Sequence, residues 1–137
     1  MVETRICEFG FPGPLRDRLV AAVLSGTKTS TTSLLAEWKA EGDELPEPGE
    51  QQTVIDSAGE PVATIEITAC EVRELADVDD VVARAEGEDY STASAWRAEH
   101  ERFWREEVLP GWEGSEPPEI SDRTLVVVQW FRVKAQR

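Results

Sequence analysis

The sequence has 137 residues, of which 40% are hydrophobic, including five Trp and four Phe. This composition predicts one folded domain over residues 1–137. Its formal net charge of −14 disfavours long duplex nucleic acid, because Lys and Arg supply much of the affinity for phosphates. The charge instead favours a small nucleoside-like ligand or a short single-stranded RNA as partner.

No apolar stretch reaches the roughly 20 residues that cross a bilayer. The N-terminus also lacks the basic start and apolar core of a signal peptide. We therefore expect a cytoplasmic protein with no membrane partner; the oligomeric state is unknown from the sequence.

In the N-terminal half, Pro12-Gly13-Pro14 forms a rigid turn that leads into a helix with an apolar stripe and Gly26 as its C-cap. A short helix is expected over residues 34–40, closed near Gly42. Two strands, 51–56 and 61–72, follow and are joined by a turn at residues 57–60.

In the C-terminal half, Asp77 is predicted to cap a helix that ends near Gly87, and Ser91 a longer helix that runs to about Glu107. Trp96, His100, Phe103 and Trp104 share the inner face of this helix. A Val-rich interior strand is expected over residues 124–133. The hairpin connection favours an α+β fold with a mostly antiparallel sheet, curled into a small barrel, over a doubly wound sheet.

Metal and cofactor binding are not indicated. Cys7 and Cys70 stand apart and His100 is the only His, whereas a structural zinc site needs four closely spaced ligands. We expect both cysteines to be buried apolar side chains, and we predict no metal and no cofactor.

The run from Thr27 to Ser33 contains six hydroxyls and one lysine, Lys28. One interpretation is a solvated loop whose hydroxyls cap neighbouring helices. The other is a cleft in which a desolvated Lys28 acts as a base for a Ser or Thr nucleophile. The run lacks the spacing of a phosphate-binding P-loop.

Two further segments are candidates. One is the acidic run Glu86-Gly87-Glu88-Asp89, read either as a helix junction or as the source of a carboxylate that pairs with Lys28 or serves as general acid. The other is Trp96-Arg97-Ala98-Glu99-His100, which is either core or one wall of a ligand site, since aromatic side chains stack on unpaired bases.

These motifs together resemble the ASCH domain family. Gly26-Thr27-Lys28-Thr29-Ser30-Thr31 is similar to its Gly-x-Lys-x-x-Thr signature. Nearly the whole chain resembles the larger bacterial branch of the family. The resemblance lies in the order of three motifs: this run, then Glu86-Gly87-Glu88, then Trp96-Arg97-x-x-His100. The resemblance implies a PUA-like fold, a small mostly antiparallel β-barrel with flanking helices and a cleft at the signature.

A smaller branch of the family includes amidohydrolases that remove the acetyl group from N4-acetylcytidine. This similarity implies that Lys28 is the proton acceptor, Thr31 the nucleophile and Glu88 the proton donor, with Glu86 as the alternative donor. The remaining predicted ligand-binding residues are Ser30, Ser33, Glu86, Trp96, Arg97 and His100.

The sequence departs from the smaller branch at Ser33, where that branch carries Arg. Two alternatives to an amidohydrolase are therefore kept. One is a non-catalytic RNA or nucleotide reader in which Lys28 and Arg97 contact phosphate and Trp96 or Trp38 stacks on a base. The other is a ribonuclease in which His100 works with Lys28 or a carboxylate.

Overall fold

A mixed sheet of five strands, in the order β1-β3-β4-β5-β2, forms the centre of the molecule. The computed structural model describes residues 4–136. β1 runs parallel to β3 and every other neighbouring pair is antiparallel. The strands are β1 (Arg5–Cys7), β2 (Ser30–Leu34), β3 (Gln51–Ile55), β4 (Pro61–Glu74) and β5 (Leu125–Gln136).

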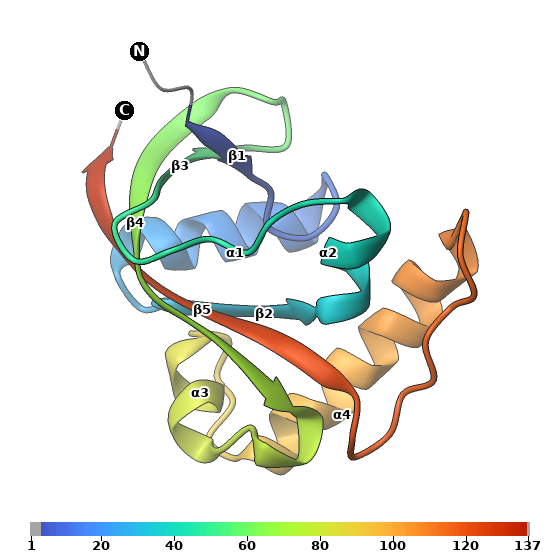
Figure 1. The fold of residues 1–137 in the computed structure, drawn as a ribbon. Coiled ribbons are helices and arrows are strands. Elements are labelled where there is room, and N and C mark those ends of the chain that lie inside the picture. The colour runs from blue at the N-terminus through green and yellow to red at the C-terminus, as the bar shows by residue number, and fades with distance from the viewer. Residues whose placement is uncertain (1–3, 137) are drawn as a thin grey trace.

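The sheet curls into a half-barrel because β4 and β5 are long and their pairing is irregular. Their register shifts between Thr64 and Ile65 and again between Ile67 and Ala69. Such irregularities bend a strand and increase its twist. Figure 1 shows the resulting curve, with β1 and β3 on one side of α1 and β2 and β5 on the other.

Within residues 4–136, four α-helices flank the sheet: α1 (Pro14–Ser25), α2 (Leu35–Glu41), α3 (Asp80–Ala85) and α4 (Ala93–Phe103). Short helical turns extend them, namely η1 (Leu75–Asp77) before α3, and the π-helical turn η2 (Trp104–Val108) and η3 (Leu109–Gly111) after α4. No helix in the described part of the chain is long and apolar enough to cross a membrane.

Each face of the sheet buries its own hydrophobic cluster. α1 packs with Phe9 and Phe131 on the inner face, while α3 and α4 cover the other face with Trp96 and Trp104. The alternation of β5 explains this division, because Val126, Val128 and Trp130 face one cluster and Phe131 faces the other.

The α+β fold and its mostly antiparallel sheet confirm the prediction, and the Val-rich last strand is interior as expected. The predicted caps were displaced. Asp79, not Asp77, accepts the capping bond from Val82, because residues 75–77 form the turn η1. Thr92, not Ser91, caps α4.

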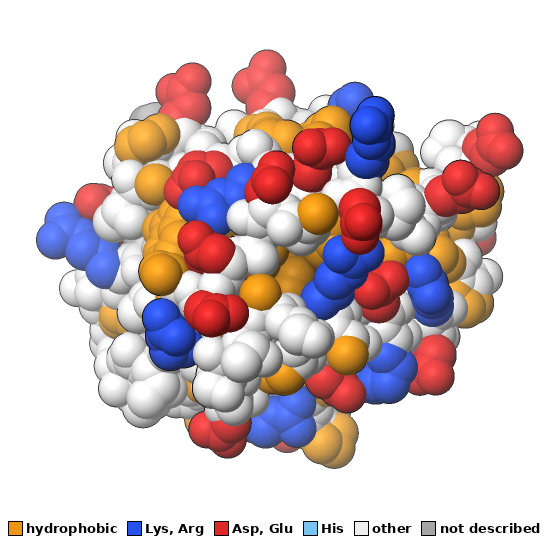
Figure 2. Space-filling view, turned by 90° about the horizontal axis from the view of Figure 1, so that it is seen from below, with side chains coloured by type: hydrophobic (Ala, Val, Ile, Leu, Met, Phe, Trp, Pro, Cys, Tyr) orange, Lys and Arg blue, Asp and Glu red, His pale blue; other side chains and the backbone are white. Residues whose placement is uncertain are grey.

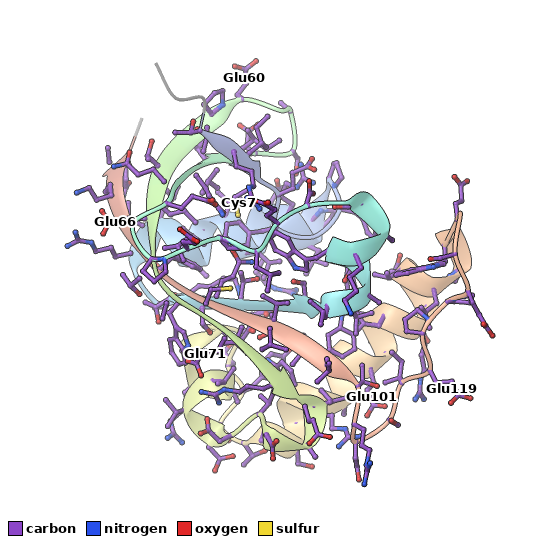
Figure 3. All side chains as sticks on the ribbon, in the orientation of Figure 1. Cys7, Glu60, Glu66, Glu71, Glu101 and Glu119 are labelled. Atoms are coloured by element: carbon purple, nitrogen blue, oxygen red, sulfur yellow. The ribbon has the colours of Figure 1, made fainter. Side chains whose placement is uncertain are left out.

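Two strands were not predicted. β1 is three residues long, and β2 is built from Ser and Thr within the run that was read as a loop or cleft. Both cysteines are half-buried rather than fully buried. Figure 3 shows Cys7 in the interior, whereas Glu60 and Glu119 project outward.

Candidate active site

The chain turns sharply between α1 and β2, and this turn directs Lys28 into the molecule. Gly26 adopts the left-handed conformation and ends α1. The backbone amides of Thr27 and Lys28 then both donate to the carbonyl of Ala22, at 3.1 and 3.0 Å. Thr27 and Thr29 remain exposed, while Lys28 between them is almost fully buried.

The end of α3 packs directly on this turn. The amide of Thr29 donates to the carbonyl of Ala85 at 2.8 Å. Gly87 has a positive φ of 72°, and a Cβ atom there would lie 2.5 Å from the carbonyl oxygen of Thr27 and 2.7 Å from Cα of Lys28. Only glycine accepts both this conformation and this close approach. Gly87 therefore brings the acidic residues on either side of it to Lys28.

The ammonium group of Lys28 forms ion pairs with two carboxylates from this junction and a hydrogen bond with one of them. Lys28 Nζ donates to Glu86 Oε2 at 2.8 Å and to the Glu86 carbonyl at 3.2 Å. It lies 4.0 Å from Glu88 Oε2 and 5.7 Å from the ring centre of Phe9. Lys28 and Glu86 are 1% and 2% exposed, so this is a buried ion pair.

The two carboxylates have opposite pKa shifts. Burial is the largest single effect on Glu86 and favours its protonated form. The charges of Lys28 and His100 and the hydrogen bond from Lys28 together outweigh burial, so the pKa of Glu86 is lowered. The buried Thr32 hydroxyl also acts on Glu86, although it makes no hydrogen bond of ordinary geometry. Burial has the largest effect on the pKa of Glu88 and raises it, and the negative charge of Glu86 raises it further. The site therefore holds one firmly ionised and one more easily protonated carboxyl.

His100 on α4 completes this cluster. Its ring stacks on Trp96 at 4.1 Å, and Nδ1 lies 2.9 Å from the Trp96 carbonyl. A carbonyl only accepts, so Nδ1 carries a proton and donates it. Nε2 then faces Glu86 Oε1 at 4.0 Å. His100 is thereby oriented towards the carboxylates rather than towards solvent.

These groups lie at one end of a cleft of about 590 Å³. The cleft is lined from one side by Phe9, in the segment before α1, and by Arg16, in the first turn of α1. The other side is formed by Phe103 and His100 of α4. β2 and β5 form part of the wall through Thr31 and Gln129. At its far end lie residues of α2, with Trp38 donating from Nε1 to Ser33 Oγ at 2.8 Å.

The structure brings most of the predicted site residues to this cleft. Its lining includes the three predicted catalytic residues and three of the predicted ligand-binding residues, namely Lys28, Thr31, Glu88, Glu86, Ser33 and His100. Thr31 is half-buried and makes no hydrogen bond to Lys28 within residues 4–136. Of the acidic run, Glu86 and Glu88 line the cleft, whereas Asp89 is exposed outside it.

The other three predicted ligand-binding residues lie outside the lining. Ser30 is fully buried at the start of β2, and Trp96 is fully buried beneath His100. Arg97 forms ion pairs with Asp122 at 2.7 Å and with Glu101 at 3.0 Å. In this structure Trp96 supports His100, and Arg97 ties α4 to the segment before β5.

Sequence reasoning did not single out Arg16 or Gln129, which are both buried and line the cleft. Arg16 donates to the backbone carbonyls of Phe9, Gly10 and Asp56 and so holds the segment before α1. The sequence carried a signal for Gln129, because it is the one polar residue within the apolar run from Leu125 to Phe131.

Glu86, Glu88 and His100 are the described residues that could hold a metal ion, with ligand atoms within 4.8 Å of one another. The Lys28 ammonium already forms ion pairs with both carboxylates. Its positive charge would oppose a second cation at the same carboxylates. The prediction of no metal is untested by this arrangement.

The curled sheet, its flanking helices and the cleft beside β2 define an α+β protein of PUA-like architecture. A family model described as ASCH domain matches residues 5–134, and the chain therefore belongs to the ASCH domain family. No match was found among curated proteins.

Solved structures similar to this chain include the following two. A protein from Enterococcus faecalis V583 is 32% identical, with a TM-score of 0.83 over 97% of this chain and 77% of that one. An ASCH domain from Lactobacillus crispatus JV V101 is 25% identical, with a TM-score of 0.78 over 95% of this chain and 79% of that one.

Proposed function

We propose that this protein is an amide hydrolase that acts on an acylated nucleoside such as N4-acetylcytidine. The observation that carries the proposal is the Lys28 cluster. A buried lysine, bonded to Glu86, lies 4.0 Å from a second carboxyl whose pKa is raised, in a cleft that Thr31 also lines. Nucleophilic amide cleavage needs a hydroxyl, a base and a proton donor within one pocket.

The groups have distinct roles in this proposal. The Thr31 hydroxyl attacks the acyl carbon and its proton passes to Lys28. The carbon–nitrogen bond then breaks, and Glu88 protonates the leaving amine. Water next attacks the acyl ester on Thr31, with Glu88, now ionised, taking a proton from the water. Lys28 returns its proton to Thr31, and the acid and the amine leave.

Lys28 must be deprotonated to accept the proton of Thr31. Glu86 accepts a 2.8 Å hydrogen bond from Lys28 Nζ and so holds the base in position. His100 and the Thr32 hydroxyl act on the same carboxylate and lower its pKa, so they help to keep Glu86 ionised. Glu86 thus supports the base, while Glu88 is the group that meets the leaving amine.

The charges of the cleft favour an uncharged ligand. The basic side chains in the lining all have a carboxylate partner: Arg5–Glu50, Arg16–Glu8, Arg18–Glu88, Lys28–Glu86 and Arg102–Glu99. A phosphate would have to compete with these carboxylates. On the face seen in Figure 2, basic side chains are likewise interspersed with acidic ones, with no continuous basic area.

The cleft volume of about 590 Å³ is in the range of ordinary small-molecule sites, roughly 300–1,000 Å³. An acylated nucleoside is a neutral ligand of suitable size. These features favour the hydrolase over an RNA reader or ribonuclease, both of which need a path for the phosphate backbone.

The test is incubation with N4-acetylcytidine and chromatographic detection of cytidine. Wild-type protein should release cytidine, and Lys28→Ala and Thr31→Ala should not. Lys28→Arg should also be inactive, because arginine keeps the charge but cannot act as a base. Thr29→Ala is the matched control, since Thr29 is exposed in the same run. No turnover by the wild type above Lys28→Ala would refute the proposal for this substrate.

A further inference from the structure

Gln129 is a buried polar side chain to which no role has been assigned. It lies on β5, is only 7% exposed and lines the cleft. Its neighbours along the strand, from Leu125 to Val128 and from Trp130 to Phe131, are apolar or aromatic. Burying a carboxamide without a partner costs stability, so its position calls for an explanation.

The side chain of Gln129 makes no hydrogen bond to any other described residue, and it is not sealed off from the cleft. Gln52 provides a contrast. It is also buried and lines the cleft, but its Nε2 donates to Glu50 Oε2 at 2.7 Å. The donor capacity of Gln129 is therefore free for a ligand, while that of Gln52 is used within the protein.

The strand register places Gln129 beside Thr31. The two residues are direct cross-strand partners between β2 and β5, and both line the cleft. Side chains of such partners lie on the same face with Cβ atoms about 4.5–5.5 Å apart. A carbonyl carbon attacked by the Thr31 hydroxyl would hold its oxygen within reach of a carboxamide at that distance.

We propose that the Gln129 carboxamide donates a hydrogen bond from Nε2 to the acyl oxygen of the substrate and stabilises the oxyanion that forms when Thr31 attacks. This inference rests on the proposed function and assigns a catalytic residue to it. When the Thr31 Oγ–carbon bond forms, the carbonyl π electrons move onto oxygen, and the Gln129 N–H faces the resulting negative charge. The charge returns to re-form the carbonyl when the amine leaves.

The test compares Gln129→Met with Gln52→Met, which removes a similar carboxamide from the same cleft. Gln129→Met should lower kcat for N4-acetylcytidine by about 100- to 1,000-fold, as loss of an oxyanion donor typically does, with little change in KM. Its Tm should be unchanged or raised, because an unpartnered buried polar group is replaced by an apolar one. Gln52→Met should keep kcat and lower Tm.

A second readout separates this inference from the proposed function. In ¹⁵N-labelled wild-type protein, the side-chain amide resonances of Gln129 should shift when N4-acetylcytidine is added. Turnover that is unaffected by Gln129→Met, or a fall in Tm of that variant, overturns the inference alone. No turnover together with a shift of the Gln129 amide overturns the hydrolase and leaves the carbonyl contact standing. Absence of both turnover and shift overturns both.

Discussion

At the Lys28 end of the cleft the charged groups are largely buried and form ion pairs with each other, whereas at the α2 end they reach the solvent. We call Lys28, Glu86 and Glu88 the buried end, and Trp38, Glu37 and Glu41 the open end. Glu41 is exposed, and Trp38 and Glu37 are half-buried. At the open end Arg5 lies over the Trp38 ring at 5.5 Å and also pairs with Glu50.

The difference separates groups suited to proton transfer from groups suited to ligand contact. Charges interact strongly when they are removed from water and only weakly when water surrounds them. Substitutions at the buried end should therefore have large effects on stability and rate, while those at the open end should have small ones. The following predictions test this contrast, from the largest expected effect to the smallest.

Lys28→Met should have the largest effect on stability. It leaves Glu86 buried without its ion-pair partner, and breaking such a pair costs about 3–5 kcal/mol of unfolding free energy. Urea unfolding measures this loss. Arg5→Met at the open end is the control and should cost less than about 1 kcal/mol, since its pair is partly exposed.

The difference between wild type and Lys28→Met should shrink in acid. The lowered pKa of Glu86 contributes stability above its ordinary value of 4.5, and that contribution is lost as the pH falls through the lower folded-state pKa. Without Lys28, the buried carboxyl is instead destabilising when ionised, and acid relieves this. A difference that grows on acidification would contradict the assignment of a buried pair.

Gly87→Ala should be next in size. The added Cβ meets the backbone of Thr27 and Lys28 and sits at a positive φ. Backbone strain of about 1–2 kcal/mol and crowding of about 1–3 kcal/mol together predict a loss of roughly 2–5 kcal/mol. Gly59→Ala is the control, because Gly59 has a similar φ but open space around it, and strain alone should remain.

Glu88→Gln should lower the turnover rate about 100-fold, because a carboxamide cannot supply the proton to the leaving amine. In the wild type, the raised pKa keeps Glu88 protonated to higher pH than an ordinary glutamate, and kcat should fall as pH rises through that pKa. Glu88→Gln should lack this fall. Glu99→Gln, which also removes a carboxylate from the lining, should retain the wild-type pH profile.

The same pKa shift predicts a stability change with the opposite pH dependence from that of Glu86. The pKa of Glu88 is raised in the folded state, so the folded protein holds this proton more tightly than the unfolded chain does. The resulting stability is fully present below pH 4.5 and is lost as pH rises through the folded-state pKa. Glu88→Gln should therefore gain stability relative to wild type as pH increases over that interval. Thermal unfolding at a series of pH values measures this, and a relative loss would show that Glu88 is instead stabilised in its ionised form.

Ser33→Ala should have the smallest effect. It removes the acceptor of the Trp38 Nε1 hydrogen bond at the open end, which is worth about 0.5–1.5 kcal/mol. Because Trp38 is half-buried, water can replace part of this bond, and kcat should be unchanged. A loss of turnover comparable to that of Glu88→Gln would mean that the open end takes part in the reaction.

Much of the fold could be predicted because periodicity and turn residues are local properties. The helix that ends at Gly26, the hairpin of β3 and β4, and the Val-rich interior strand follow directly from them. β2 was missed because Ser and Thr carry a weak strand signal and are equally common in caps. Its strand conformation depends on pairing with β5, which is almost 100 residues away.

The candidate site was likewise predicted only in part from the sequence. The sequence by itself determined that Lys28, the hydroxyls around it and an acidic run at residues 86–89 were the chemical groups to consider, because residue types are visible in one dimension. Thr31 was singled out among the hydroxyls by the resemblance to the ASCH family. Only the tertiary structure decided that Glu86 bonds Lys28, that Glu88 is the more easily protonated carboxyl, and that Asp89 faces away. It also placed Gln129 beside Thr31. The reason is physical: pKa values, ion pairing and cross-strand neighbours depend on burial and on contacts between distant segments, which the order of residues does not contain.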